Sequence, residues 1–180
     1  MTAETSALPR AVRGDVGSVT TAALIILVIA AATIAGAWFF QLVLDIAPCP
    51  MCLEQRYAYY AIIPVSALSA LVAARGGPRG LLVLVFALIA LAALGNAAFG
   101  AYHAGVEWGF WPGPTSCTGS FGNFGSAGSL LDQLDKVKVV PCDVVQFRFL
   151  GISLAGYNAL ISLLMAAVAA WGITRSVKAG

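Results

Sequence analysis

The sequence predicts an all-α integral membrane protein, an antiparallel bundle of four transmembrane helices, and two observations predict it. Hydrophobic residues make up 60% of the 180 residues and charged residues only 10%. Soluble domains average about 45–50% apolar and about 25% charged residues, so the composition excludes an ordinary water-soluble globule. The second observation is that four long stretches carry no Asp, Glu, Lys or Arg. A helix needs about 20 apolar residues to cross a bilayer core.

The uncharged stretches indicate where the chain crosses the membrane. The first, third and fourth hold 29, 27 and 26 residues, which is enough for a span. The second, 57–74, holds only 18 residues and reaches span length if its helix begins nearer Leu53. Continuously apolar runs exclude an outer-membrane barrel, whose strands alternate polar and apolar residues. The sequence predicts one membrane domain over 1–180, with spans at approximately 18–44, 54–74, 80–103 and 150–173.

Charges beside the spans predict the orientation. The N-terminal tail, the turn at 75–79 and the C-terminal end together hold six Arg or Lys residues and two acidic residues. The segments on the other side, approximately 45–53 and 104–149, are acidic on balance together with their flanks. Because positively charged segments stay in the cytoplasm, both termini are predicted to be cytoplasmic and both of these loops periplasmic.

The second predicted periplasmic loop, 104–149, contains one helical pattern. Its first half is rich in Gly and Pro, which break regular structure. In its second half, Ser129 and Asp132 form a capping-box pattern, and Leu130 and Leu134 fall on one helical face. We therefore expect a short surface helix in this loop.

All four cysteines fall in the predicted periplasmic loops. Cys49 and Cys52 belong to the first loop, and Cys117 and Cys142 belong to the second. Disulfides persist outside the cytoplasm, so an even number of cysteines there indicates disulfide chemistry. Two purely structural bridges would satisfy this count as well.

The Cys49-Pro50-Met51-Cys52 motif favours redox chemistry over a structural role. A bridge across so small a ring constrains the unfolded chain little, and low-pKa thiols are typical of C-x-x-C pairs. The motif precedes the second span, where a helix N-terminus favours a thiolate at Cys52. Arg56 lies on the same helix face as Cys52. We expect Arg56 to stabilise that thiolate and to hydrogen-bond a lipid-soluble oxidant, with snorkelling to lipid phosphate as the alternative.

Other uses of these cysteines fit less well. Covalent haem attachment needs His directly after C-x-x-C, where this chain has Leu53. The spacing of Cys117 and Cys142 lacks the second C-x-x-C of a zinc ribbon, so no metal is expected. A net charge of +2 is too small to indicate nucleic-acid binding.

The second cysteine pair could be structural or reactive. A bridge between Cys117 and Cys142 closes a 26-residue loop, worth about 3.5 kcal/mol by chain entropy, so stability alone could explain it. Cys117 lies in the glycine-rich half of its loop, where we expect it to be exposed to another protein's thiolate. Two dithiol pairs beside a bilayer suggest an electron relay. Because no flavin or nicotinamide fingerprint occurs, a membrane quinone is the simplest terminal acceptor.

These features together resemble the bacterial disulfide bond formation protein B (DsbB) family over nearly the whole chain. The resemblance rests on the four spans, the order of the two cysteine pairs, Arg56 four residues after Cys52, and the segment 147–151 that enters the last span. It implies a multi-pass enzyme of the bacterial inner membrane. Such an enzyme oxidises a periplasmic thioredoxin-fold thiol oxidase similar to DsbA and reduces ubiquinone or menaquinone.

The resemblance also implies an order of thiol steps. The partner's thiolate would attack the Cys117–Cys142 disulfide at Cys117, and the released Cys142 would then attack Cys49. The freed Cys52 thiolate would pass electrons to the quinone, with Arg56 assisting.

Two further positions bear on the quinone site. We expect the quinone at the outer edge of spans one, two and three, near Cys52 and Arg56. His103 is similar in position to a family residue near the quinone, although an interface histidine with a local hydrogen bond is an equal alternative. Gln55 stands where relatives often have an acidic residue, which leaves quinone affinity and redox poise open.

Two alternatives remain at this point. A vitamin K epoxide reductase-like oxidoreductase also combines four spans with two cysteine pairs, but there the spaced pair comes first and C-x-x-C later. A four-span membrane scaffold would need its outer disulfides only for stability. The first alternative differs from a DsbB-like enzyme in the order of its cysteine pairs. The second differs in that its disulfides do not exchange.

Overall fold

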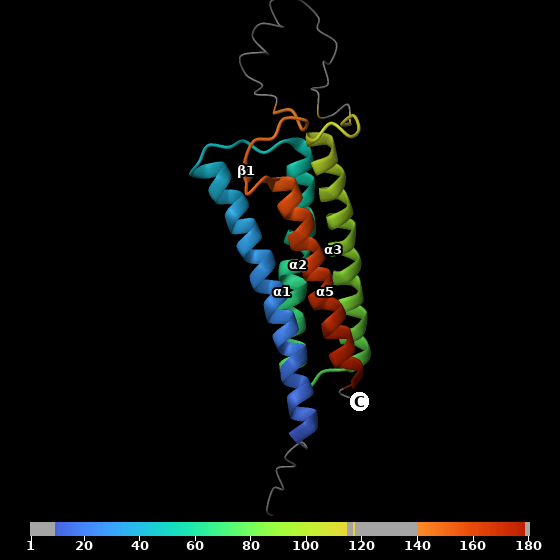
Figure 1. The fold of residues 1–180 in the computed structure, drawn as a ribbon. Helices are drawn as coiled ribbons and strands as arrows, with labels where there is room; N and C mark the ends of the chain where they lie inside the picture. The colour runs from blue at the N-terminus through green and yellow to red at the C-terminus, as the bar shows by residue number, and fades with distance from the viewer. Residues whose placement is uncertain (1–9, 115–116, 118–139, 179–180) are drawn as a thin grey trace, which may run out of the picture.

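The computed structural model describes residues 10–114, 117 and 140–178, and it is almost entirely helical. Figure 1 shows four long helices side by side. They are α1 (Arg10–Leu42), α2 (Pro50–Ala74), α3 (Arg79–Glu107) and α5 (Leu154–Lys178). All four are long and apolar enough to cross a membrane, which confirms the predicted four-span helical bundle. The surface helix expected near Ser129 and Asp132 lies outside the described residues.

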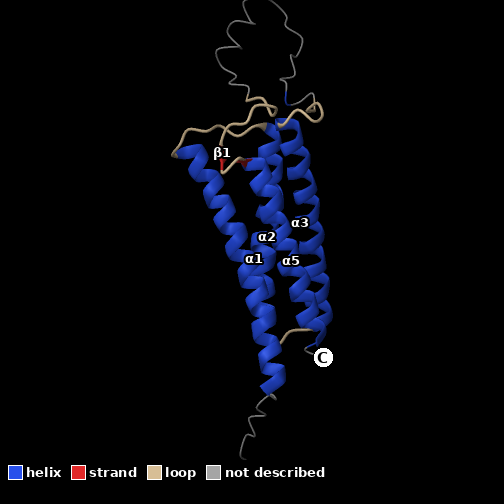
Figure 2. Cartoon of the chain, viewed as in Figure 1, coloured by secondary structure: helices blue, strands red, loops and turns tan. Residues whose placement is uncertain are grey.

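The helices alternate in direction, so the chain's functional segments collect at one end. The start of α1 and the end of α5 lie together at the lower end of the view, with the turn between α2 and α3 (Figure 1). The connections that carry the cysteines lie at the upper end, drawn as loops in Figure 2. Helix α3 packs most extensively on α5, and α1 packs on both α2 and α5.

Helix α2 begins at Pro50, four residues before the predicted start of the second span. Proline fits the first helical position because its missing N–H would have had no helical partner there. Cys49 is the N-cap, and its Sγ accepts a hydrogen bond from the backbone N–H of Cys52 at 3.3 Å. The C-x-x-C motif therefore forms the first turn of α2.

Helix α5 begins at Leu154, four residues after the predicted start of the last span. The two-residue strands β1 (Arg148–Phe149) and β2 (Ile152–Ser153) pair antiparallel just before it. Leu150 and Gly151 connect them with φ angles of 49° and 81°, the left-handed conformation that tight hairpins require. The Ser153 hydroxyl then accepts the backbone N–H of Gly156 at 3.2 Å and caps the helix.

Helix α3 continues to Glu107, four residues beyond the predicted end of the third span. It approaches α5 closely at Gly100, where a Cβ would lie 3.0 Å from the Ala159 backbone nitrogen. Small residues at such contacts let transmembrane helices approach each other.

The outer faces of the helices are apolar. Val28, Leu68 and Leu91, from three different helices, are 64%, 62% and 66% exposed. Large exposed apolar surfaces on all sides suit a protein surrounded by lipid rather than water.

Candidate functional site

The four cysteine sulfurs gather where the loops meet the upper end of the bundle. Cys117 and Cys142 form a disulfide with a Cα–Cα distance of 5.3 Å, whereas Cys49 and Cys52 are free thiols. Both disulfide sulfurs are buried among apolar neighbours that include Met51 and Cys49. The expectation that Cys117 is exposed is therefore wrong, because the residue is only 2% exposed and packs within this cluster.

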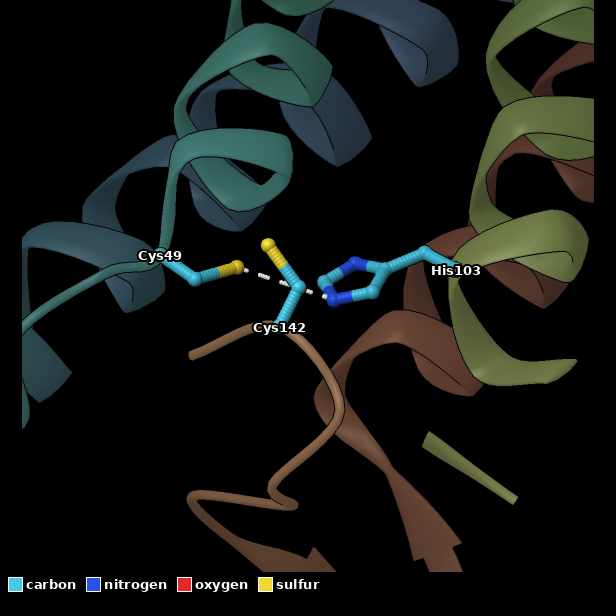
Figure 3. Close-up of side chains that lie close together, drawn as sticks. All are labelled: Cys49, His103 and Cys142. Carbon is cyan, nitrogen blue, oxygen red and sulfur yellow. Dashed lines mark hydrogen bonds between the residues drawn. The ribbon is translucent and has the colours of Figure 1, made fainter. Parts of the chain in front are cut away.

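The two cysteine pairs meet at Cys49. The Sγ atoms of Cys49 and Cys142 and a ring nitrogen of His103 all lie within 4.8 Å of one another. Figure 3 shows Cys49 and His103 pointing toward each other, with Cys142 beside the hydrogen bond that joins them. On its other side, Cys49 Sγ is hydrogen-bonded to Cys52 Sγ at 3.0 Å. From Cys117 through Cys142 and Cys49 to Cys52, each sulfur therefore lies close to the next.

This cluster has the spacing of a metal site, but its chemistry favours thiol exchange. The Cys142 sulfur is already bonded to Cys117, which leaves Cys49 and His103 as available ligands of this group. Protein zinc sites usually supply three or four ligands.

The contacts around Cys49 favour its thiolate. The pKa of Cys49 is lowered from 9.0 to about 5, first by the hydrogen bond with Cys52 and then by the His103 ring, against the raising effect of burial. The first-turn N–H of Cys52 adds a third contact that prefers a negative sulfur. The sequence predicts that the N-terminus of α2 favours a thiolate at Cys52. Because Cys49 is the N-cap and its sulfur accepts the first-turn N–H, the N-terminus favours a thiolate at Cys49 instead.

Arg56 is buried against α1 rather than against the thiols. Its guanidinium donates to the Gln41 side-chain oxygen at 2.8 Å and to the Ala37 carbonyl at 3.5 Å, and lies 5.5 Å from the Trp38 ring centroid. Arg56 is 9% exposed, and no carboxylate among the described residues pairs with it. It forms no described hydrogen bond to Cys52, and its expected stabilisation of that thiolate stays a prediction.

A cavity of about 630 Å³ lies beside Cys52 and Arg56. Its wall comes from α1, α2, α5 and the segments 46–48 and 146–149. It is mostly apolar, and its few polar groups include the side chains of Gln55 and Tyr59. The cavity differs from the expected position in that α5, not α3, forms the third wall. In Figure 1, α1 diverges from α5 toward this end.

His103 contacts Cys49 and Gln55 at the start of α2. Its Nε2 is 3.6 Å from Cys49 Sγ and its Nδ1 is 2.9 Å from Gln55 Nε2. The residue is 1% exposed and is not among those that line the cavity. The structure thus gives His103 a thiol contact, where the family resemblance implied a position near the quinone.

Sequence reasoning noted Gln55 only as a departure from relatives, and it did not assign Tyr59, Asn158 or Glu107 to the site. Gln55, Tyr59 and Asn158 are connected by hydrogen bonds behind His103. Glu107 lies one turn beyond His103 on α3, with one buried carboxylate oxygen that has no partner among the described residues. The available signals were the Gln55–Tyr59 spacing on α2 and the spacing of His103 and Glu107, each four residues apart.

Comparison with known proteins identifies this constellation. The family model for disulfide bond formation protein DsbB matches residues 19–172, which include all of α2 and α3, α1 beyond its start and most of α5. The chain belongs to the DsbB family. A curated relative, disulfide bond formation protein B of Polaromonas sp. (strain JS666 / ATCC BAA-500), is 27% identical over 156 residues, covering 82% of this chain and 86% of the relative. No solved structure matches the chain.

DsbB membership confirms the resemblance drawn from the cysteine pattern. It supports a multi-pass membrane protein with a role in disulfide bond formation, and it favours a disulfide oxidoreductase over a membrane scaffold.

Proposed function

We propose that this DsbB-family protein takes two electrons from a periplasmic thioredoxin-fold thiol oxidase and passes them through its two cysteine pairs to a membrane quinone. The observation that carries the proposal is the close approach of successive cysteine sulfurs. Cys142 lies within 4.8 Å of Cys49, Cys49 lies 3.0 Å from Cys52, and Cys52 borders the cavity. Thiol–disulfide exchange needs such direct approach of sulfurs.

The relay begins at the Cys117–Cys142 disulfide. The partner's thiolate attacks Cys117 Sγ, a partner–Cys117 bond forms, and Cys142 leaves as a thiolate. Because Cys117 and Cys142 are at most 2% exposed, docking of the partner has to expose Cys117 before this attack.

The second exchange crosses to the C-x-x-C pair. In the oxidised enzyme Cys49 and Cys52 form a disulfide, and the Cys142 thiolate attacks Cys49 Sγ. A Cys49–Cys142 bond forms, the Cys49–Cys52 bond breaks, and the electron pair stays on Cys52 as a thiolate. The described geometry supports this choice of sulfur because Cys142 shares a cluster with Cys49.

The residues around the cavity fit a quinone. A buried Arg56 with no carboxylate partner among the described residues is costly in lipid unless a polar ligand group accepts from it. The apolar wall suits a prenyl chain, and the cavity volume is in the range of small-molecule sites. A quinone bound there would accept two electrons and two protons. Arg56 would donate a hydrogen bond to a quinone carbonyl, and Gln41 and Trp38 hold its guanidinium in place.

The proposal includes an orientation in the membrane. The excess of Arg and Lys at the termini and at the α2–α3 turn supports a cytoplasmic position for that end. The cysteine end of the bundle then faces the periplasm of a bacterial inner membrane, where a thioredoxin-fold oxidase can reach it.

The test is steady-state reduction of a water-soluble ubiquinone analogue by a reduced thioredoxin-fold oxidase, followed by absorbance with purified protein in detergent. We expect turnover in the wild type and in the exposed control Glu54→Gln, and none with Cys52→Ser or Cys117→Ser. Replacing Cys142 alone should trap a mixed disulfide between the partner and Cys117. No turnover in any form, with disulfides inert to the partner, would contradict the proposal and favour the scaffold.

A further inference from the structure

A chain of hydrogen bonds runs from the thiol site into the bundle. Gln55 Nε2 lies 2.9 Å from His103 Nδ1, and the Asn158 amide donates to Gln55 Oε1 at 2.6 Å. The Tyr59 hydroxyl donates to Asn158 Oδ1 at 2.6 Å. Gln55 and His103 are 5% and 1% exposed, so water competes little and each bond orients the next.

The Cys49 end of this chain determines which group donates at each step. A thiolate offers only lone pairs, so His103 Nε2, 3.6 Å from Cys49 Sγ, bonds it only when that nitrogen carries a hydrogen. The neutral ring then has its lone pair on Nδ1. Gln55 can satisfy that lone pair with its amide N–H, which leaves its oxygen to accept from Asn158. Every member of the chain thus donates toward Cys49.

No charged side chain on the Nδ1 side competes with this arrangement among the described residues. The groups whose charge acts on His103 are Cys49 and Glu107, and Arg148 acts in turn on Glu107. The Cys142 backbone also hydrogen-bonds the His103 ring, which adds an acceptor that needs a ring hydrogen. The described hydrogen bond at Nδ1 is the one with the Gln55 amide.

We propose that Gln55, held by Asn158, is a positioning residue that keeps His103 in its Nε2–H tautomer and so makes Cys49 the leaving thiolate of the relay. This inference rests on the proposed function. In the step concerned, the partner's second thiolate has closed the partner's own disulfide and released Cys117 as a thiolate, and this Cys117 thiolate attacks Cys142 in the Cys49–Cys142 bridge. The Cys117–Cys142 bond forms, the Cys49–Cys142 bond breaks, and the electron pair stays on Cys49 Sγ, where His103 Nε2–H donates to it.

An acidic residue at position 55 would act in the opposite direction. A carboxylate can only accept, so it draws a hydrogen onto Nδ1. Gln55→Glu, a change of almost no volume, therefore tests the amide itself rather than the packing.

The tautomer of His103 can be measured directly because His103 is the only histidine of the protein. Protein labelled with ¹⁵N-histidine, fully reduced and in detergent, gives ring nitrogen signals from this residue alone. We expect the wild type to show the unprotonated nitrogen at Nδ1 and the protonated nitrogen at Nε2. Gln55→Glu should place a hydrogen on Nδ1, whereas the exposed neighbour variant Glu54→Gln should keep the wild-type pattern.

A second readout follows the thiolate. Loss of one hydrogen bond to a charged group changes the acid dissociation constant of the thiol by about tenfold, so Gln55→Leu should slow alkylation of Cys49 by about that factor at about pH 4, below the pKa of about 5. Asn158→Leu, which leaves Gln55 in place but removes its support, should slow it in the same direction. Peptide mass spectrometry resolves Cys49 from the other thiols, and circular dichroism confirms that each variant is folded.

Neither readout needs the partner or the quinone, so the result is independent of the relay. A hydrogen on Nδ1 in the wild type, or the same tautomer and alkylation rate in Gln55→Glu and wild type, would overturn the role of Gln55. Failure of quinone reduction with the wild-type tautomer as expected would instead overturn the proposed function.

Discussion

Cys142 and Cys49 lie with their Sγ atoms within 4.8 Å of each other, although Cys142 is disulfide-bonded to Cys117. This approach joins the two cysteine pairs across 93 residues of sequence. In the proposed relay, this approach is the link between the two disulfide-forming pairs.

The approach of Cys49 and Cys142 predicts a new disulfide when their usual partners are removed. In the double variant Cys52→Ser, Cys117→Ser, the two remaining thiols should bridge on mild oxidation because little movement separates them from bonding distance. Peptide mapping without reductant detects the bridge, and a reduced sample is the control. Two persistently free thiols would contradict the described arrangement.

The low pKa of Cys49 predicts its reactivity with pH. In the reduced protein its thiolate persists as the pH falls to about 5, because Cys52 and His103 donate to the sulfur. Alkylation of Cys49 should therefore be maximal at neutral pH and should decline only below about pH 5, whereas an ordinary cysteine declines below about 8.5. His103→Ala should move the decline to higher pH. A decline of the wild type near pH 8.5 would contradict the contacts around Cys49.

The contacts of Arg56 predict a quinone-binding defect. Arg56→Lys keeps the charge but loses the planar fork that reaches Gln41 and the Ala37 carbonyl. We expect the KM for quinone to rise by about tenfold, the cost of one charged hydrogen bond. The partner's reduction of the Cys117–Cys142 disulfide should keep its rate.

The matched control for Arg56→Lys is Arg75→Lys, the same change at the far end of α2. It should leave the KM for quinone unchanged. An equal rise in both variants would show a general loss of structure instead of a site at Arg56.

The close contact of α3 and α5 predicts a stability difference between two glycines. Gly100→Ala places a Cβ 3.0 Å from the Ala159 nitrogen and should reduce the free energy of unfolding by about 1–3 kcal/mol. Gly95→Ala, with nothing within 4 Å, should be neutral or stabilising by up to about 1 kcal/mol. Denaturation in mixed detergent micelles measures both. Equal effects would contradict the described packing of the two helices.

The membrane architecture could be predicted from the sequence because a helix that crosses a bilayer needs a long run of apolar residues. Uncharged stretches of sufficient length locate the spans without knowledge of their packing. The ends of the helices could not be placed as well, since Pro50 and the Leu150–Gly151 turn act through local backbone geometry. These two features moved the starts of α2 and α5 by four residues each.

The site could be predicted only where its residues are neighbours in sequence. The C-x-x-C pair and Arg56 belong to one helix, so their spacing alone groups them. The preference for a Cys49 thiolate depends on His103, 54 residues away, and the burial of Cys117 depends on packing between two loops. No periodic pattern in the sequence indicates contacts between residues that are so far apart along the chain.

The order in which disulfides appear tests the central claim most directly. The oxidised protein is mixed with a reduced thioredoxin-fold oxidase and a soluble quinone, quenched after increasing times with acid, and its disulfides are mapped by mass spectrometry. The relay predicts that the Cys117–Cys142 bridge disappears first and that a Cys49–Cys142 bridge appears before the quinone is reduced. Reduction of the quinone while the Cys117–Cys142 bridge stays intact, with no Cys49–Cys142 species at any time, would contradict it.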